Sequence, residues 1–309
     1  MIRTSASTSI ALFTCGSLFA LAAAATAEEV TFDPTYQVGK RYHYEQTINS
    51  AVKMALGELK MDQESAMVMN LSLGVTAGDS GNKLVTAKTE RLRADMNMLG
   101  QAMSYDSDKP EASNSLISGI FSAAMGGETT LVFSEDDEFV EVKSAPDDAA
   151  PKKGGLGGMM GGADMAGGQI QQFATDLVRN DFPEGPVAPG TSWETKQSMD
   201  VPQIGDLTTA LDNTYVGMEK PEGAAKELAR VDFQGTMGAG AGEAKSGSTS
   251  VGFKGGDIKG SYYYDPDDRV MRRLDVEMEI TMTMNNGETT MELPTKQKSS
   301  ALLTELEDQ

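Results

Sequence analysis

The chain has very few of the residues on which most enzymatic chemistry depends. Its 309 residues include one Cys, one His and one Trp, and 26 Lys and Arg against 46 Asp and Glu give a formal net charge of −20. A single Cys builds neither a disulfide framework nor a Cys-x-x-Cys site, and a single His builds no His cluster. The shortage of basic residues argues against nucleic acid and anionic membranes as partners. These absences predict a protein without a cofactor.

Long apolar runs are also scarce, and the one that exists lies at the N-terminus. Residues 1–27 combine Arg3, an uncharged apolar run from Ile10 to Ala25 and an Ala-x-Ala motif that ends at Ala27, which are the features of a secretory signal peptide. The run is shorter than the roughly 20 residues that a membrane-spanning helix needs. We therefore expect cleavage near Ala27 and a periplasmic or secreted protein without a transmembrane segment.

Cys15 offers an alternative, because a cysteine preceded by Leu12 and followed by Gly16 resembles a lipid-anchoring site. The bulky Phe13 and Thr14 fit such a site poorly, and the apolar run before Cys15 is very short. Lipid anchoring is the less favoured alternative.

Alternation of apolar and polar residues dominates the rest of the chain, over 42–54, 67–75 and 274–284. Strands of this kind bury one face and leave the other in water, which is typical of an antiparallel sheet. Gly- and Asn-containing turns at 78–81 and 285–287 join them.

Two segments have helical spacing instead, near 113–126 and 168–181, and Pro183 ends the second. Each apolar stripe needs a partner surface, and the apolar face of the sheet supplies one. The predicted fold class is mainly β (α+β): a large curved antiparallel sheet with two helices packed on its apolar face.

The sheet is predicted to come from two related halves of one domain, 28–143 and 169–309. The opening GKRY at 39–42 matches GTSW at 190–193, and FSEDD at 133–137 matches YDPDD at 264–268. Chance similarity between β meanders is the alternative explanation. The Gly- and Met-rich segment 144–168 between the halves is predicted to be a flexible excursion.

No catalytic constellation emerges from the polar residues. His43 alternates with Tyr42 and Tyr44, so we expect it on the polar face of its strand. The acidic residues are scattered, so a carboxylate-dependent hydrolase is an alternative without nameable residues. The acidic turn at 265–268 lacks the twelve-residue pattern of a calcium loop. We therefore expect no catalytic residues and a protein that is not an enzyme.

Methionine is unusually frequent, with 20 residues. Three interpretations compete: Met fills the core of an irregular sheet, a thioether-lined concavity binds an apolar ligand, or soft thioethers bind Cu(I). The copper alternative would use Met159, Met160 and Met165, in the Gly-rich segment.

The segment 182–193, FPEGPVAPGTSW, resembles the P-x-x-P-V-x-x-G-x-x-W segment of an uncharacterised family of exported bacterial proteins. Tyr105-Asp106-Ser107 resembles the Y-D-S strand end of that family, and the opening YQVGKRY at 36–42 is similar too. The resemblance covers 30–305 and implies export and a β-rich fold, with no activity. More loosely, the predicted sheet is similar to half-barrel envelope carriers of lipids or lipoproteins.

These observations predict a non-enzymatic exported protein that binds an apolar ligand, or another envelope protein, in the concave face of its sheet. The predicted ligand-contacting residues share an inward-facing position on two strands: Met67, Met69, Leu71, Met278, Ile280 and Met282.

Overall fold

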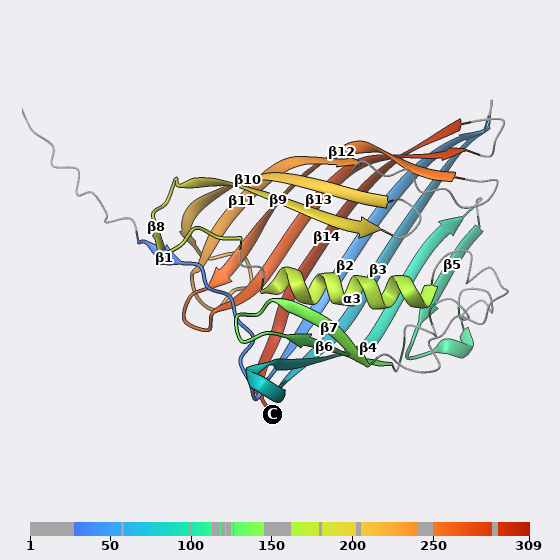
Figure 1. Ribbon diagram of the computed structural model, residues 1–309. Coiled ribbons are helices and arrows are strands. Elements are labelled where there is room, and N and C mark those ends of the chain that lie inside the picture. Colours follow the sequence, from blue (N-terminus) through green and yellow to red (C-terminus); the bar gives the residue numbers. More distant parts are fainter. Residues whose placement is uncertain are drawn as a thin grey trace, which may run out of the picture.

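A twelve-stranded antiparallel sheet forms most of the molecule in the computed structural model (Figure 1). The structure describes residues 28–56, 59–98, 101–112, 118, 121, 125, 127–144, 162–178, 181–201, 205–239, 250–285 and 290–309.

The strands of the first half of the chain are β2 (Lys40–Leu56), β3 (Leu59–Ala77), β4 (Lys83–Met98), β5 (Gln101–Asp106), β6 (Glu128–Phe133) and β7 (Phe139–Ser144). Those of the second half are β9 (Ser192–Val201), β10 (Gly205–Glu219), β11 (Leu228–Ala239), β12 (Ser250–Asp265), β13 (Val270–Asn285) and β14 (Thr290–Asp308).

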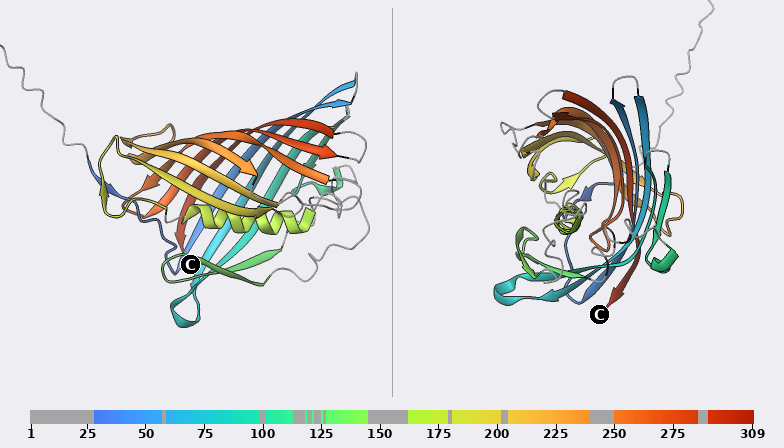
Figure 2. Two further views of the ribbon diagram at one scale, coloured as in Figure 1. Left: turned by 45° about the horizontal axis from the view of Figure 1, so that its top comes forward. Right: turned by 90° about the vertical axis from the view of Figure 1, so that its right-hand side faces the viewer.

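The strand order is an open meander in which the first and last long strands meet in the middle. The order is β7-β6-β4-β3-β2-β14-β13-β12-β11-β10-β9, with β5 also paired to β4. This order ends at β7 and β9, and the chain segment that connects these two strands carries the helix α3 (Gly162–Leu177). Seen from one end, the sheet curves around α3, which lies on its concave side (Figure 2).

Register explains why the sheet has two different faces. Tyr42 lies opposite Leu73, Ile48 opposite Met67, and Met278 opposite Gln297, so alternate residues of each strand share the concave face. The predicted strands over 42–54, 67–75 and 274–284 are confirmed, as is the antiparallel pairing.

Two glycines of the concave face let neighbouring strands coil closely together. A Cβ at Gly235 would lie 1.9 Å from the carbonyl oxygen of Ala210, and one at Gly260 would lie 2.1 Å from that of Asp275. The ring of Phe233, which lies opposite Gly260, covers the space that a side chain would take. Glycine at these two positions therefore allows the sheet to curve in this half of the chain.

The expectation of two helices is corrected to one α-helix with described bounds, while Ser118 and Phe121 in the segment near 113–126 are also helical. Helix α3 begins at Gly162, inside the segment predicted to be a flexible excursion, and ends at Leu177 instead of extending over 168–181. The earlier start is physically reasonable because Ala163 and Ala166 are good helix formers and the sheet supplies a partner for the apolar stripe. Most of the helix predicted near 113–126 lies outside the described residues. No helix in the described ranges is long and apolar enough to cross a membrane.

The two halves share the geometry with which their first strand begins. Gly39 and Gly190 both have positive φ, 84° and 88°. The N–H of Gly39 donates to the carbonyl of Val75 over 2.9 Å, and the N–H of Gly190 donates to that of Tyr215 over 2.7 Å. The aligned glycines of the sequence therefore occupy equivalent places at the entries to β2 and β9.

A second, two-stranded sheet joins the N-terminal segment to the segment after α3. It pairs β1 (Val30–Thr31) with β8 (Pro186–Val187). In Figure 1 this pair lies at one end of the large sheet, beyond the end of α3. The N-terminal segment thus crosses the sheet at the end where Tyr42 and Tyr264 are buried.

Candidate functional site: the concave face of the sheet

The concave face changes character along the strands. At one end, which we call the sealed end, concave-facing side chains such as Tyr42, Leu73 and Tyr264 are no more than 1% exposed. At the other, which we call the half-exposed end, residues such as Ile48 and Met278 face the same concavity but are only partly buried. The two ends are built from different residue types, so each has its own chemistry.

An aromatic cluster closes the sealed end. The ring of Phe32 stacks on that of Phe182 with 5.2 Å between centroids, and meets Tyr215 edge-on at 5.3 Å. Trp193 lies 6.2 Å from Phe32, and Tyr264 lies 5.5 Å from it. Because aromatic side chains bury large areas, these contacts hold the N-terminal segment across the sheet.

The tyrosine hydroxyls of this end all have partners. Tyr44 donates to the carbonyl of Met271 over 2.8 Å and Tyr215 to that of Glu28 over 3.2 Å, while Tyr42 and Tyr264 accept backbone N–H groups from Gln37 and Asp33. Burial raises the pKa of Tyr44 above its ordinary range. These hydroxyls therefore stay protonated and serve as structural hydrogen-bonding groups.

Helix α3 is held against the sheet at the C-terminal half of its length. The hydroxyl of Tyr36 donates to the carbonyl of Ala174 over 2.7 Å, and Phe173 meets Tyr44 edge-on at 5.3 Å. Ile170 and Leu177 on the same stripe are buried as well. Ile170, Phe173 and Leu177 thus form the face of α3 that packs on the sheet, within the segment 168–181 that has helical spacing.

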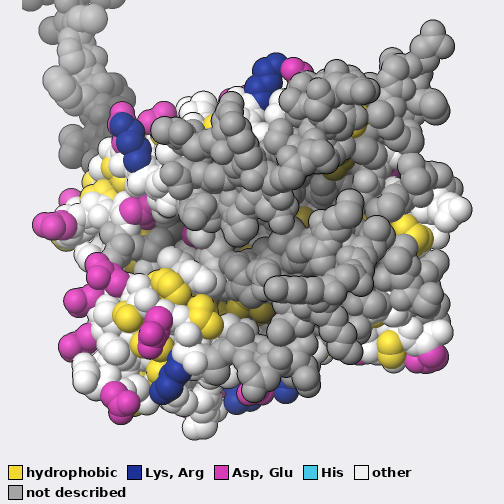
Figure 3. Space-filling view, turned by 45° about the vertical axis from the view of Figure 1, so that its right-hand side comes forward, with side chains coloured by type: hydrophobic (Ala, Val, Ile, Leu, Met, Phe, Trp, Pro, Cys, Tyr) yellow, Lys and Arg dark blue, Asp and Glu magenta, His cyan; other side chains and the backbone are white. Residues whose placement is uncertain are grey.

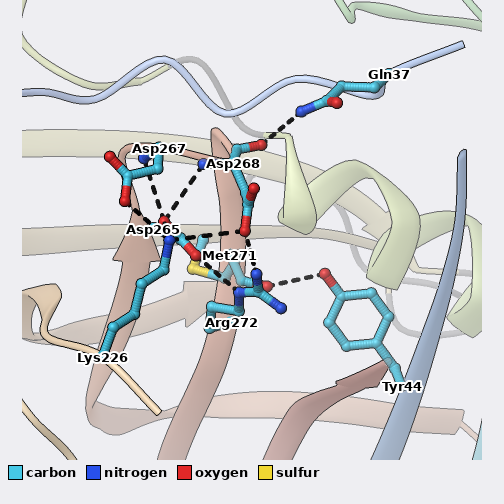
Figure 4. Close-up of polar contacts among 8 residues, drawn as sticks. All are labelled: Gln37, Tyr44, Lys226, Asp265, Asp267, Asp268, Met271 and Arg272. Carbon is cyan, nitrogen blue, oxygen red and sulfur yellow. Dashed lines mark hydrogen bonds and ion pairs between the residues drawn. The ribbon is translucent and has the colours of Figure 1, made fainter. Parts of the chain in front are cut away.

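A buried ion-pair cluster organises the β12–β13 hairpin (Figure 4). The carboxylate of Asp265 is fully buried and accepts bonds from Lys226 Nζ at 2.7 Å and Arg272 Nε at 2.9 Å. It also accepts the backbone N–H groups of Asp267 and Asp268. Burial alone would raise the pKa of Asp265, but these donors hold it below its ordinary value.

The contacts of this cluster bear on whether the acidic turn at 265–268 can bind calcium. Asp265 gives its oxygens to Lys226 and Arg272, and Arg272 also pairs with Asp268. Among the described residues, no group of three or more His, Cys, Asp or Glu is arranged to hold a metal ion. The turn therefore acts as an ion-paired corner of the hairpin.

The β6–β7 turn of the first half has a corresponding pair. Asp137, with positive φ of 62°, is 6% exposed and accepts from Lys83 Nζ at 2.7 Å, from Thr35 Oγ1 at 2.5 Å and from the N–H of Tyr36 at 3.3 Å. The lysine after the preceding Gly-containing turn reaches the acidic turn in both halves, as Lys83 and Lys226. Each of these two ion pairs connects one hairpin turn of the sheet to a neighbouring turn.

The six residues predicted to contact a ligand all face the concavity, but the structure divides them. Leu71, 1% exposed, and Met69, 9% exposed, belong to the core next to the sealed end. The other four are partly buried at the half-exposed end: Met67, Met278, Ile280 and Met282. Met67 lies on β3, and the other three lie on β13. The strands β14 and β2 lie between β13 and β3, so the four residues form two separate groups.

The methionines of the copper alternative are placed differently. Met159 and Met160 lie outside the described residues, and Met165 lies within α3, where its side chain is not described. The soft-metal alternative thus stays a prediction from the sequence.

The outer face of the sheet is charged and paired. Glu277 lies between Lys298 and Lys259, the second at 3.2 Å, and Lys296 pairs with Glu279 at 2.5 Å. Hydrogen bonds from Lys298 and Lys259 lower the pKa of Glu277. These cross-strand pairs place charged side chains along the outer face, and each contributes little to stability.

Shallow hollows on this outer face have backbone for their floors. A hollow of about 760 Å³ crosses β14, β2, β3, β4 and β5 between side chains such as Lys298, Asn49 and Asp95. A smaller one, about 470 Å³, continues over β13 and β12 between Glu277 and Lys259. Charged side chains such as Glu64, Asp95, Lys296 and Lys298 line much of these hollows, which makes them unlike an apolar binding site.

His43 lies on this outer face, as its alternation with Tyr42 and Tyr44 predicts. Its Nδ1 is 3.4 Å from Glu90 and its Nε2 is 3.2 Å from Glu307. The ring joins β2 to β4 and β14 through carboxylates. Among the described residues, no Ser, Thr or Cys side chain forms a hydrogen bond with the ring of His43.

A space-filling view shows how charged and hydrophobic side chains are distributed on one face of the molecule (Figure 3). Acidic side chains gather along its left-hand rim, and hydrophobic side chains show between that rim and the middle.

The fold defines a class: an open, strongly curved antiparallel sheet whose concave face holds a helix. No family model matches the sequence, and no curated protein matches it either. Among solved structures the chain is similar to lipovitellin, with a TM-score of 0.45 and 9% identity over 89% of this chain and 26% of that one. The chain thus spans about a quarter of the length of lipovitellin.

Two bacterial structures are more distantly similar. One is the translocator domain of the autotransporter NalP from Neisseria meningitidis, with a TM-score of 0.21 and 7% identity over 86% of this chain and 89% of that one. The other is an outer membrane lipoprotein-sorting protein domain from Vibrio parahaemolyticus, with a TM-score of 0.13 and 7% identity over 86% of this chain and 85% of that one. At this level these likenesses assign no ligand to the chain.

Sequence reasoning missed two features of the site. The aromatic residues Phe32 and Phe182 lie outside any periodic segment, so their meeting at the sealed end had no local signal. The pairing of β14 with β2 was also missed, although both strands alternate, because pairing of the chain ends is a long-range property.

Proposed function

We propose that this chain binds an apolar ligand in the half-exposed end of its concave face, and that it does so as a binding protein without catalysis. One observation carries the proposal: the concave face stays uncharged and largely apolar beyond the point where close packing ends. Met278, Ile280 and Met282 are partly exposed there, and Met67 lies at the border with the core, whereas apolar faces of monomeric proteins are ordinarily covered. Flexible thioether side chains suit ligands of variable shape.

In this proposal the two ends of the concave face have different roles. The aromatic cluster and the ion pairs of the sealed end fix the curvature of the sheet, as the contacts of Phe32 and Asp265 indicate. The half-exposed end then offers a preformed concave surface, which lowers the ordering cost of binding. A long apolar chain or several acyl chains fit such a surface better than a flat aromatic molecule, because its walls are aliphatic and thioether side chains.

Adjacent residues of β3 supply a matched test. Met67 faces the concavity opposite Ile48, and Val68 faces outward opposite Thr47. We expect the full chain to bind the apolar dye N-phenyl-1-naphthylamine, and Met67→Glu to weaken that binding by about tenfold, because a carboxylate would be desolvated by the ligand. Val68→Glu should leave binding within twofold. Dye fluorescence titration measures both, and circular dichroism confirms that both variants fold.

Two results would count against the function. A wild-type chain that binds neither the dye nor any lipid in native mass spectrometry has no apolar site. Equal losses in Met67→Glu and Val68→Glu would place the effect on folding, away from the concave face.

We also propose that the chain is exported and cleaved near Ala27, from the signal-like features of residues 1–27. The intact mass of the protein recovered from the envelope or medium of a bacterial host tests this. A mass that begins at Glu28 supports it, and a mass that retains residues 1–27 contradicts it.

A further inference from the structure

A group of polar side chains lies in the middle of the concave face, where the first and last strands of the sheet meet. These side chains alternate in register on β14, β2 and β3, and we call them the seam patch: Gln46, Ser50, Ser65, Gln297 and Ser299. Gln297 lies directly opposite Ser50, and Ser50 lies directly opposite Ser65. Side chains in such directly paired positions have Cβ atoms about 5 Å apart, so Gln297, Ser50 and Ser65 form a continuous row across the three strands. Ser299 lies opposite Ile48 and is a diagonal neighbour of both Ser50 and Gln46.

The seam patch has apolar neighbours on both sides. On β13, Met278 lies opposite Gln297, and Val276 lies opposite Ser299. On the other side, Met96 of β4 lies opposite Ser65. An uncharged polar strip thus divides the half-exposed end into two apolar wings.

The hydrogen-bonding groups of the seam patch are not paired with other described residues. Within the described part of the chain, none of its five side chains makes a hydrogen bond, while all are partly buried. The sealed end behaves differently: Asn213, 1% exposed, donates to Trp193 and Thr195, and the Tyr44 hydroxyl has its carbonyl partner. Described polar atoms that are fully buried all have partners, so the free ones are those that a ligand can reach.

The charge of the concave-facing residues limits the class of ligand head group that can bind there. Among the described concave-facing strand residues of the half-exposed end, none is charged; the nearby lysines, such as Lys296 and Lys298, are on the outer face. A carboxylate or phosphate seated on the seam patch would lose water without gaining a counterion, which is costly. Ester, amide or hydroxyl groups can instead bond to Gln and Ser at little cost.

We propose that the seam patch is the head-group site for an uncharged amphiphile, whose ester, amide or hydroxyl groups bond to Gln46 and Gln297 while its apolar chain lies along the methionine wings. This inference rests on the proposed apolar-ligand function and names the class of ligand for that site. The glutamines set the preference because each offers one acceptor and two donors, and the serines extend the same strip.

Three probes with the same chain length separate the contribution of the head group from that of the apolar chain. They are 1-monomyristoylglycerol, which has an uncharged hydrogen-bonding head, myristate, which has a charged head, and 1-tetradecene, which has none. Each is titrated into the full-length chain as a competitor of N-phenyl-1-naphthylamine at pH 8. We expect 1-monomyristoylglycerol to bind about tenfold more tightly than either other probe, as two added hydrogen bonds would give.

The double variant Gln46→Leu/Gln297→Leu removes the polar groups while keeping similar volume. It should lower the affinity for 1-monomyristoylglycerol about tenfold and leave that for 1-tetradecene within twofold. Gln234→Leu is the matched control, because Gln234 is exposed on the outer face opposite Lys259. This control should leave all three affinities unchanged.

The outcomes separate the two proposals. Equal affinity of the wild-type chain for all three probes, or tighter binding of myristate, overturns the head-group site but leaves the apolar site standing. An equal loss for 1-monomyristoylglycerol and 1-tetradecene in the double variant also overturns it, since the glutamines would then act through packing. Absence of binding by every probe overturns both proposals.

Discussion

The two ends of the concave face differ most in how their polar groups are treated. At the sealed end, a fully buried carboxylate has two cationic partners, and each of the tyrosine hydroxyls named above has a backbone partner. At the half-exposed end, the polar side chains of the seam patch have no hydrogen-bond partner among the described residues. The first arrangement is what a stable fold requires, whereas the second leaves polar groups that water or a ligand can reach. The difference separates the part of the face that holds the fold from the part available for binding.

The largest expected contrast is in the cost of removing apolar side chains at the two ends. Leu71→Ala, at 1% exposure, should lower the free energy of unfolding by about 4 kcal/mol, since it leaves a cavity in a packed core. Ile280→Ala should cost about 1 kcal/mol, because Ile280 is partly exposed and its neighbours can relax. Urea denaturation of each variant measures the difference. Equal costs would mean that the two ends are packed alike.

The next largest effect concerns the buried carboxylate. Asp265→Asn should destabilise the fold by about 3 kcal/mol, because Lys226 and Arg272 would lose the charge they share. Asp267→Asn is the control, since Asp267 is 80% exposed and its pairing with Lys226 contributes little. A cost for Asp265→Asn no greater than that of the control would show that the cluster does not hold the hairpin.

The same carboxylate predicts a dependence on pH. The pKa of Asp265 is lower in the fold than its ordinary value of about 3.9, so its contribution is fully present above that value. The contribution is lost as the pH falls through the lowered pKa. The stability difference between the wild-type chain and Asp265→Asn should therefore be constant from pH 7 to about 5 and should shrink below about pH 4. A difference that grows on acidification would contradict the sign of this shift.

The smallest effect is expected for the contact that holds α3. Tyr36→Phe removes the bond to the carbonyl of Ala174 and should cost about 1 kcal/mol, while the ring keeps its contacts with Tyr42 and Phe133. Hydrogen exchange should accelerate in α3 more than in β2 or β3. Uniform acceleration across the molecule would indicate global destabilisation instead of a looser helix.

Much of the sheet could be predicted because alternation is a local signal. The Leu274–Met284 pattern is enough to place one face of β13 in the concavity, and the same holds for Met67 on β3. The number of helices was wrong, and the start of α3 was missed, because glycine at 162 and 167 argues for a loop until a partner surface is present. Local composition outweighed the tertiary contact in that prediction.

The candidate site could be predicted only in part. The strand pattern indicates that Met278 faces inward, but exposure depends on what covers it, which is a property of the whole fold. The division between Leu71 in the core and Met67 at the half-exposed end has no local signature on β3, where both follow the same alternation. The seam patch requires the pairing of β14 with β2, whose strands are separated by most of the chain.

Methyl NMR of methionine-labelled protein tests the central claim most directly, because methionines occur at both ends of the concave face. Met271 is 2% exposed at the sealed end, and Met67, Met278 and Met282 are partly buried at the half-exposed end. With ¹³C-methyl methionine and an uncharged spin-labelled lipid, the methyl ester of 16-doxyl-stearic acid, we expect strong paramagnetic broadening of Met67, Met278 and Met282 and a sharp signal from Met271. Signals from all four that stay sharp, or equal broadening of Met271, would contradict a ligand site at the half-exposed end.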